Sequence, residues 1–318
     1  MTGVPPRRIL VTGVAGFIGS NLAVRLLDEG HEVVGIDDLS QGVREQVPEG
    51  VEFHHVDVRS PDIGALLRGA DAVFHLAAKN CIPDCQAEPV AAASINITGT
   101  VNLLESARQA GVRRVIHAES SALYEGIDTF PTGEDRVAAR SIYAITKLAG
   151  AAFAGAYERY HGMQITGLRY FCVYGPRQDY RRTVPPVMSA FIIKLLSGER
   201  PTIYGTGEKR RDFIYVDDVN DFHLQCLTDD RTCGRTFNLG SGTDYSVREI
   251  YDEIQSLMGT NVEPLHAPDL PGEAERTCGD IAQARELGWA PGTGLREGLQ
   301  WTIDYIRRNV VSADGLTA

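Results

Sequence analysis

Tyr143 and Lys147 stand four residues apart in the stretch Ser-Ile-Tyr-Ala-Ile-Thr-Lys. On a helix this spacing places both side chains on one face, with their Cβ atoms about 5–6 Å apart. A phenol is a weak base at neutral pH because its pKa is about 10, but a cation about 4 Å away favours the phenolate by on the order of 4 kcal/mol. The pair therefore predicts a proton-transfer device that works at neutral pH. Taken alone, the same spacing also fits a core aromatic residue followed by a solvated lysine.

A glycine-rich turn near the start of the chain indicates a dinucleotide site. An apolar stretch at 8–12 leads into Gly-Val-Ala-Gly-Phe-Ile-Gly, then a helical pattern, then a second apolar stretch that ends at Asp37. This order of strand, glycine turn, helix, strand and acid is typical of a βαβ unit that binds a dinucleotide. Gly13 allows the tight turn, Gly16 lets the backbone approach a pyrophosphate, and Gly19 allows close packing of the helix on the strand.

The same unit favours one dinucleotide over the other. The start of the helix offers unpaired N–H groups to the phosphates. Asp37 is placed to accept hydrogen bonds from both ribose hydroxyls, and its charge would repel a 2′-phosphate, so we expect NAD rather than NADP. The residues of this unit that we expect to bind the cofactor are Gly13, Gly16, Phe17, Ile18, Gly19 and Asp37.

Strands and helices continue to alternate along the chain. Strand-like stretches at 51–56, 72–76, 113–117 and 164–170 are accompanied by helical patterns at 94–110 and from Tyr143 to about Tyr160. This alternation predicts an α/β fold of the Rossmann type, with a doubly wound, mostly parallel sheet. Ligands bind beyond the carboxyl ends of the strands in such sheets. The candidate residues at the expected strand ends are Gly13, Asp37, Asp57, Val58, Ala77, Ala78, Ser120 and Tyr170. Among them we also expect Asp57, Val58, Ala77, Ala78 and Tyr170 to bind the cofactor, with Asp57 and Val58 near the adenine.

The regular alternation weakens after Pro176. Helical patterns remain at 184–198, 246–258 and 295–308. We expect two parts. Residues 1–176 would form the NAD-binding domain, with a return of the chain over about 211–240, and residues 177–210 and 241–318 would form a smaller C-terminal lobe that binds the substrate.

Composition excludes several classes of protein. The 318 residues are 43% hydrophobic and 23% charged, which is ordinary for a soluble globular protein. The net charge of −11 disfavours a nucleic-acid partner. Six scattered cysteines indicate a reduced, cytoplasmic protein, and Cys81 and Cys85 lack further ligands at a suitable spacing, so we expect no metal. No stretch approaches 18 uninterrupted apolar residues, so we expect no membrane span.

Over residues 8–308 the chain resembles the extended short-chain dehydrogenase/reductase family, and within it the NAD-dependent nucleotide-sugar epimerases and dehydratases of the UDP-glucose 4-epimerase type. The resemblance rests on GVAGFIG, on Asp37, on Ser120, on the Tyr143–Lys147 pair, and on the stretches RYFCVYGPRQ and RRDFIYVDDV. It implies NAD as cofactor and a nucleotide sugar, most often a UDP-sugar, as substrate. It also implies a homodimer formed through two helices per subunit, here residues 94–110 and the helix that carries Tyr143.

The resemblance implies a role for each residue of the site. Tyr143, as a phenolate, removes a proton from a sugar hydroxyl while hydride leaves the same carbon for NAD. Lys147 lowers the pKa of Tyr143 and holds the nicotinamide ribose, and Ser120 hydrogen-bonds the reacting oxygen. Arg211 is the first candidate for the substrate's phosphates and Arg276 the second. The full substrate-binding set that we expect is Lys79, Ser120, Ser121, Tyr143, Cys172, Tyr204, Arg211 and Arg276.

The residues after Ser120 bear on the reaction type. The resembling 4,6-dehydratases carry Asp and Glu directly after the corresponding Thr, and decarboxylases also need the Glu, but this chain has Ser121 and Ala122. Glu119 and Glu125 flank the motif, yet a shift of one residue on a strand turns a side chain to the other face. The pattern therefore favours 4-epimerisation of a UDP-hexose, UDP-N-acetylhexosamine or UDP-hexuronate through a transient 4-keto sugar. A 4,6-dehydratase, a decarboxylase and a net NAD-dependent reductase are the alternatives.

Three positions depart from the family pattern. Leu270 precedes Pro271-Gly272 where an Arg is often found, and Arg276 could compensate. Cys172 stands where many relatives carry Asn, and a thiol is a weaker donor than an amide. Lys79 is unusual after the Ala77-Ala78 pair. Lys79 could contact a hydroxyl or carboxylate of the hexose, or it could be solvated. A contact with the hexose would favour a uronic acid as the sugar.

Overall fold

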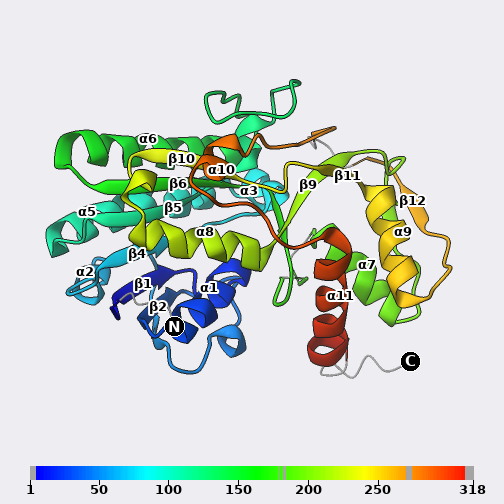
Figure 1. The fold of residues 1–318 in the computed structure, drawn as a ribbon, viewed down its shortest axis with the longest axis horizontal. Coiled ribbons are helices and arrows are strands. Elements are labelled where there is room, and N and C mark those ends of the chain that lie inside the picture. Colours follow the sequence, from blue (N-terminus) through cyan, green and yellow to red (C-terminus); the bar gives the residue numbers. More distant parts are fainter. Residues whose placement is uncertain (1–4, 179, 182–183, 270–273, 312–318) are drawn as a thin grey trace.

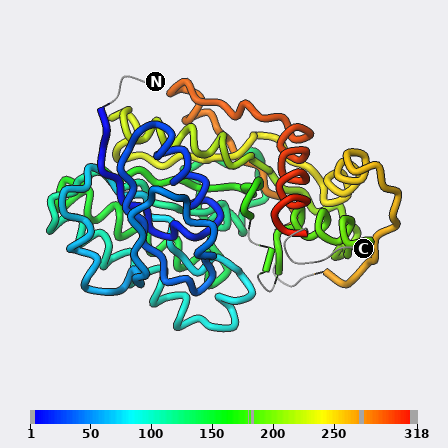
Figure 2. Tube along the Cα trace, turned by 90° about the horizontal axis from the view of Figure 1, so that it is seen from below, coloured from blue at the N-terminus to red at the C-terminus, as the bar shows by residue number. Residues whose placement is uncertain are grey.

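The computed structural model describes residues 5–178, 180–181, 184–269 and 274–311. Leu270 therefore lies outside the residues that the structure describes. A large α/β domain and a smaller lobe lie side by side, with helices α7, α9 and α11 in the lobe (Figure 1). The view turned by 90° shows the same two parts, with the N-terminal strands in the larger one and the C-terminal helix in the smaller (Figure 2). Within the described ranges no helix is long and apolar enough to cross a membrane.

The first part of the chain alternates strands with helices. The elements are β1 (Arg8–Thr12), α1 (Phe17–Asp28), β2 (Glu32–Asp37), β3 (Glu52–His55), α2 (Ile63–Leu66), β4 (Ala72–His75), α3 (Ile82–Ala87), α4 (Pro89–Ala93), α5 (Thr100–Ala110), β5 (Arg114–Ser120), α6 (Ile142–His161) and β6 (Gln164–Tyr170).

The second part contains shorter strands. The elements are β7 (Cys172–Tyr174), α7 (Val187–Leu196), β8 (Thr202–Tyr204), β9 (Arg210–Tyr215), α8 (Val216–Thr228), β10 (Arg235–Leu239), β11 (Asp244–Ser246), α9 (Val247–Met258), β12 (Leu265–Ala267), α10 (Ala282–Glu286) and α11 (Leu295–Ile306).

Seven parallel strands form the central sheet, in the order β10-β6-β5-β4-β1-β2-β3. This arrangement confirms the doubly wound α/β fold that the alternation predicted. Two small sheets lie outside it, β11-β9-β7 and the parallel pair β12-β8. Short strands of this kind pair with segments distant in sequence, and a local pattern does not reveal their partners.

Alternate residues of β1 face opposite sides of the central sheet. Ile9 and Val11 belong to a core shared with α1 and α8, whereas Leu10 belongs to a core shared with α2 and α5. A strand buried on both faces reads as a continuous apolar stretch, which is why the sequence around β1 shows no polar alternation. The lobe has its own core, in which Phe191 of α7 meets Tyr251 of α9 edge to face, with ring centroids 5.2 Å apart.

The expected helix over 94–110 is not uniform. Residues Ser94–Gly99 form a wider π-helical turn, and α5 begins only at Thr100. Asn96, on this turn, points inward and holds the backbone of Lys79 on both sides: its Oδ1 accepts from the Lys79 N–H at 2.8 Å and its Nδ2 donates to the Lys79 carbonyl at 3.0 Å. Wide turns of this type occur where a helix must present an inward side chain, and helical periodicity alone does not reveal them.

The glycine turn after β1 leaves no room for side chains. Gly13 has a φ of +72°, and a Cβ at that position would lie 2.9 Å from the backbone nitrogen of Ala77. A Cβ at Gly19 would lie 2.1 Å from the Gly13 carbonyl oxygen, which is backbone and cannot rotate away. Both glycines are therefore required by contacts inside the protein, before any ligand is considered.

Replacing Gly19 by alanine should destabilise the fold. The added methyl group would push α1 away from the glycine turn, and overpacking of this type costs about 1–3 kcal/mol. The matched control is Gly64→Ala on α2, where a Cβ meets nothing within 4 Å, and a small gain of about 0.5–1 kcal/mol is expected there. Denaturant unfolding measures both changes. Equal effects at the two positions would contradict the steric explanation.

Candidate active site

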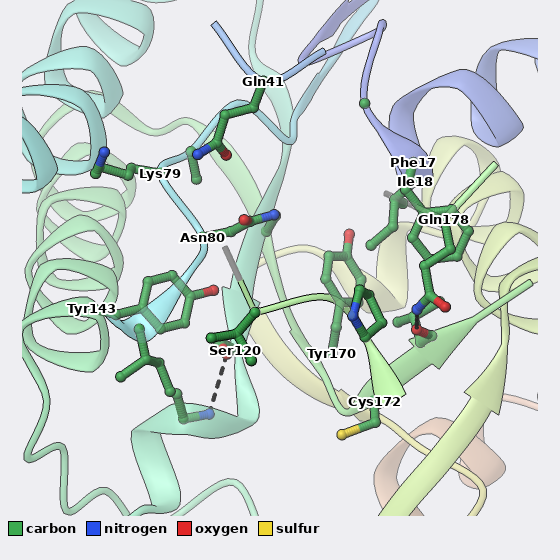
Figure 3. A pocket seen from close by; sticks show the side chains of 18 of the residues that line it. Phe17, Ile18, Gln41, Lys79, Asn80, Ser120, Tyr143, Tyr170, Cys172 and Gln178 are labelled. Atoms are coloured by element: carbon green, nitrogen blue, oxygen red, sulfur yellow. Dashed lines mark hydrogen bonds between the residues drawn. The ribbon is translucent and has the colours of Figure 1, made fainter. Parts of the chain in front are cut away.

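A cavity of about 1020 Å³ lies at the carboxyl edge of the central sheet, between the α/β domain and the lobe. Figure 3 shows Tyr143, Ser120, Asn80 and Tyr170 gathered around one part of it. Nearly all of the site residues expected from the sequence line this cavity: Gly13, Gly16, Phe17, Ile18, Gly19, Asp37, Asp57, Val58, Ala77, Ala78, Lys79, Ser120, Ser121, Tyr143, Lys147, Tyr170, Cys172, Tyr204 and Arg211.

The N-terminal end of the cavity has the donors and acceptors that a dinucleotide needs. Helix α1 begins after Gly16 with no capping side chain, and Phe17 and Ile18 line the cavity, so the first N–H groups of the helix are available to phosphate oxygens. Asp37 is buried at the end of β2, and its two oxygens accept from the N–H groups of Ala15 and Leu39 at 3.0 and 2.9 Å. Burial raises the pKa of Asp37, while these two N–H groups oppose the shift. The residues present therefore fit NAD.

Lys147 is buried below Tyr143 on helix α6. Its Nζ donates a hydrogen bond of 2.8 Å to the carbonyl oxygen of Ala118 on β5. Burial lowers the pKa of Lys147 to about 8, although the charge of Glu119 works in the opposite direction. Tyr143 has 9% of its surface exposed and packs against Cys85 and Ala92. The phenol is thus held between an apolar cluster and a buried ammonium group.

Ser120 is the last residue of β5, at the same end of the sheet. Strand β5 extends further than predicted, to Ser120, because residues 118–120 pair with residues 168–170 of β6. The Ser120 hydroxyl accepts a hydrogen bond of 3.2 Å from the Ala122 N–H, which leaves its proton available as a donor. Tyr143 and Ser120 converge on one region of the cavity (Figure 3).

Two glutamates flank this region, and each is held by a different partner. Glu119 forms a buried ion pair with Arg169 of β6, with 2.8 Å between Oε2 and Nε. Glu125 accepts hydrogen bonds from the N–H and hydroxyl of Ser141, at 2.7 and 2.8 Å, just before α6 begins. Both residues are among those that line the cavity.

Most cations of the cavity are already paired. Lys79 forms an ion pair of 2.6 Å with Glu88 and points away from Ser120 (Figure 3), and Lys209 pairs with Asp269 at 3.0 Å. Arg211 donates to the carbonyl of Arg210 at 2.9 Å and, among the residues that the structure describes, has no carboxylate within 4.0 Å.

Arg276 lies elsewhere. It pairs with Asp244, stacks over the ring of Phe130 and is not part of the cavity lining. The structure thus brings Arg211, but not Arg276, to the cavity. Asp57, the residue expected near the adenine, lines the cavity while its carboxylate pairs with Arg59.

Several cavity residues were not expected from the sequence. Gln41, Asn80 and Gln178 point toward the cavity in Figure 3. Asn80 follows the Ala77-Ala78 pair at the end of β4, and Gln178 closes the stretch RYFCVYGPRQ, so the motifs already contained both signals. Gln178 is fixed by hydrogen bonds to the Val173 carbonyl and from the Ser189 hydroxyl.

Metal ligands do not gather at this site. No group of three or more His, Cys, Asp or Glu residues suited to a metal ion occurs in the part of the chain that the structure describes. Cys81 and Cys85 are both buried, and Cys85 donates to the Lys79 carbonyl.

The family model of the NAD-dependent epimerase/dehydratase family matches residues 9–240. The chain belongs to this family. NAD is its cofactor. A UDP-glucose 4-epimerase of Mycolicibacterium smegmatis is 38% identical over 310 residues, which cover 94% of this chain and 98% of that protein.

Solved structures show the same similarity. A UDP-glucose 4-epimerase of Thermotoga maritima with UDP-glucose superposes with a TM-score of 0.92, at 33% identity, and the match covers 95% of this chain and 99% of that one. A UDP-glucuronic acid 4-epimerase of Bacillus cereus, in complex with UDP-glucuronic acid and NAD, has a TM-score of 0.88 at 30% identity, over 95% and 99% of the two chains. Enzymes that act on a neutral and on an acidic sugar are thus similar to this chain to nearly the same degree.

The buried ammonium of Lys147 should make stability depend on pH. Below about pH 8 both the folded and unfolded states hold the proton, and the cost of burying the charge is fully present. Between about pH 8 and 10.5 the folded state loses the proton before the unfolded state does, so stability rises with pH. The stability of the wild type relative to Lys147→Met should therefore increase by on the order of 3 kcal/mol over this range.

Denaturant unfolding of the cofactor-free proteins at several pH values measures this difference. The comparison with Lys147→Met removes the contribution of the buried tyrosines and cysteines, which titrate in both proteins. A difference that does not change with pH would contradict the assignment of the lowered pKa to Lys147.

Proposed function

We propose that this protein epimerises a UDP-sugar at C4 through a transient 4-keto sugar. The observation that carries the proposal is the convergence of Tyr143, Ser120 and buried Lys147 on one region of the cavity, with Ser121 and Ala122 rather than acids beside them. The similarity to UDP-sugar 4-epimerases from several organisms supports it.

The chain's own residues perform the proton chemistry. The Tyr143 phenolate takes the proton from the sugar O4, and the ammonium of Lys147 stabilises the phenolate. Ser120 donates to O4 and holds it beside Tyr143. NAD, when bound, supplies the hydride acceptor and the hydride donor of the cycle. The same Tyr143 returns the proton to O4 after the keto sugar has presented its other face, so no net oxidation results.

The positions of the acids argue against elimination and decarboxylation. An elimination needs an acid for the leaving hydroxyl and a base for the C5 proton, and neither Ser121 nor Ala122 can supply them at neutral pH. Glu119 is held in its ion pair with Arg169, and Glu125 stands five residues after Ser120 rather than directly after it. A relative with decarboxylase activity exists, a UDP-glucuronic acid decarboxylase of Xenopus tropicalis that is 30% identical over 312 residues. The residues after Ser120 favour epimerisation here.

The lobe would hold the nucleotide diphosphate. Arg211 reaches the cavity from β9 without a carboxylate partner in the described chain, so its charge is available to phosphate oxygens. Tyr204 lines the same side and is 44% exposed, which leaves its ring available to a base. Cys172 lines the cavity between the two halves.

The assembly that we propose is a homodimer. Helix α6 exposes Ile145, Leu148 and Phe153, at 50%, 38% and 41% of their surfaces. Neighbouring apolar side chains on one helix are typical of a surface that another subunit covers. Because α6 also carries Tyr143, such an interface would fix the catalytic helix.

The reaction is tested with Tyr143→Phe and with product analysis. Loss of the phenol should reduce epimerisation by about 10²–10⁴-fold, with NAD binding retained. The matched control is Tyr160→Phe, because Tyr160 lies on the same helix and is 73% exposed. NMR of incubations with UDP-glucose, UDP-N-acetylglucosamine and UDP-glucuronate identifies the products. A 4-keto-6-deoxy sugar, release of carbon dioxide or net consumption of NADH would replace the proposal with one of its alternatives.

The diphosphate contact is tested by comparing Arg211→Met with Arg276→Met. Removing a charge-assisted contact typically costs 1.5–3 kcal/mol, so Arg211→Met should weaken UDP binding about tenfold or more. Isothermal titration with UDP measures the affinity of each variant. A large loss for Arg276→Met, with little change for Arg211→Met, would reverse the assignment.

A further inference from the structure

Glu125 lines the cavity and is held by segments on both sides of it in the sequence. Its N–H donates to the Ala122 carbonyl at 3.2 Å, at the end of the short helical turn that Ser120 caps. Its carboxylate accepts from Ser141, which caps α6 two residues before Tyr143. Glu125 therefore contacts the segments that carry both Ser120 and Tyr143, and it lines the same cavity as these two residues.

This carboxylate has no cation as partner in the described chain. Its hydrogen-bond donors are the N–H groups of Ser141 and Arg140, at 2.7 and 3.2 Å, and the Ser141 hydroxyl, at 2.8 Å. The Arg140 side chain is exposed and forms no ion pair with it within 4.0 Å. A carboxylate offers about four acceptor positions, so one is left without a protein donor. Glu125 thus brings to the cavity lining a negative charge that hydrogen-bond donors stabilise but that no cation of the described chain neutralises.

The cations around the cavity do not offset this charge. Lys79 is neutralised by Glu88, Lys194 pairs with Glu199, and Lys209 pairs with Asp269. Lys147 is bound to the Ala118 carbonyl below Tyr143. Arg211, on the lobe, is the remaining cation among the described residues of the lining, and the diphosphate would use it.

We infer that the sugar of this enzyme is uncharged at C6, and that Glu125 is a specificity-determining residue that disfavours a uronate. The inference rests on the proposed C4 epimerisation. In a hexose C6 is attached to C5, the neighbour of the reacting C4, so a C6 carboxylate would enter the cavity that Tyr143 and Glu125 both line. Among the described residues of that lining, Lys79, Lys194 and Lys209 are paired with carboxylates. A C6 hydroxyl can instead donate a hydrogen bond to Glu125.

The experiment compares two substrates that differ only at C6. UDP-glucose and UDP-glucuronate share the nucleotide, the diphosphate and the reacting C4, so the ratio of their kcat/KM values isolates the C6 group. Repulsion between two partly solvated charges is worth a factor of about ten or more, and the wild type should favour UDP-glucose by at least that factor. Glu125→Gln keeps the size and the hydrogen-bonding ability of the side chain and should shift the ratio toward UDP-glucuronate about tenfold.

The matched variant is Ser141→Ala, which disturbs the Glu125 contact and the start of α6 but leaves the charge in place. It should slow both substrates by the same factor and leave their ratio unchanged. If Glu125→Gln leaves the ratio unchanged as well, or if the wild type uses UDP-glucuronate as well as UDP-glucose, the inference is wrong although the epimerase proposal stands.

Binding measurements separate the two proposals. Isothermal titration of the NAD-loaded wild type and of Glu125→Gln with each nucleotide sugar gives the same comparison without turnover. If the wild type binds UDP-glucose more tightly and Glu125→Gln removes this preference, the inference is supported even when neither sugar is epimerised. Absence of epimerisation would contradict only the proposed reaction. Equal affinities in both proteins contradict the inference.

Discussion

The site depends on keeping an ammonium group out of water. Lys147 is nearly fully buried, and desolvation of a charge is among the most expensive terms in a folded protein. Two features of β5 offset that penalty: the Ala118 carbonyl accepts from the ammonium, and Glu119, one residue on, contributes a negative charge. Glu119 also forms an ion pair with Arg169. Its negative charge therefore stabilises the Lys147 ammonium less than an unpaired carboxylate would.

Holding Lys147 in this place constrains its helix. Helix α6 passes so close to β5 that a Cβ at Gly150 would lie 3.3 Å from the His117 ring. Ser141, together with Glu125, fixes where the helix begins, and Asn96 donates to the Thr146 hydroxyl in the second turn. The position of Tyr143 is therefore set by contacts that hold α6 at Ser141, Thr146 and Gly150.

The central sheet and the main site residues could be predicted from the sequence, because those site residues stand at the ends of strands. β1, α1 and β2 follow from an apolar pattern interrupted by glycines at fixed positions, and the parallel sheet then brings Asp37, Ser120 and Tyr170 to one edge. The partners of charged side chains could not be predicted in the same way. Among 42 acidic residues nothing local indicates that Lys79 would choose Glu88, or that Arg276 would choose Asp244. Such choices depend on distances between segments that only the folded chain establishes.

The path of the chain after β6 has a consequence for how the protein is put together. It leaves the central sheet through β7 and α7, comes back with α8 and β10, leaves again through β11 and α9, and passes α10 against β10 before ending in α11 (Figure 1). The edge strand β10 is thus made from sequence that lies between two visits to the lobe. A cut after β7 would strip the sheet of that strand and expose the edge of β6. The lobe is therefore not one continuous segment of the chain, and it cannot be exchanged as a single piece without removing β10 from the central sheet.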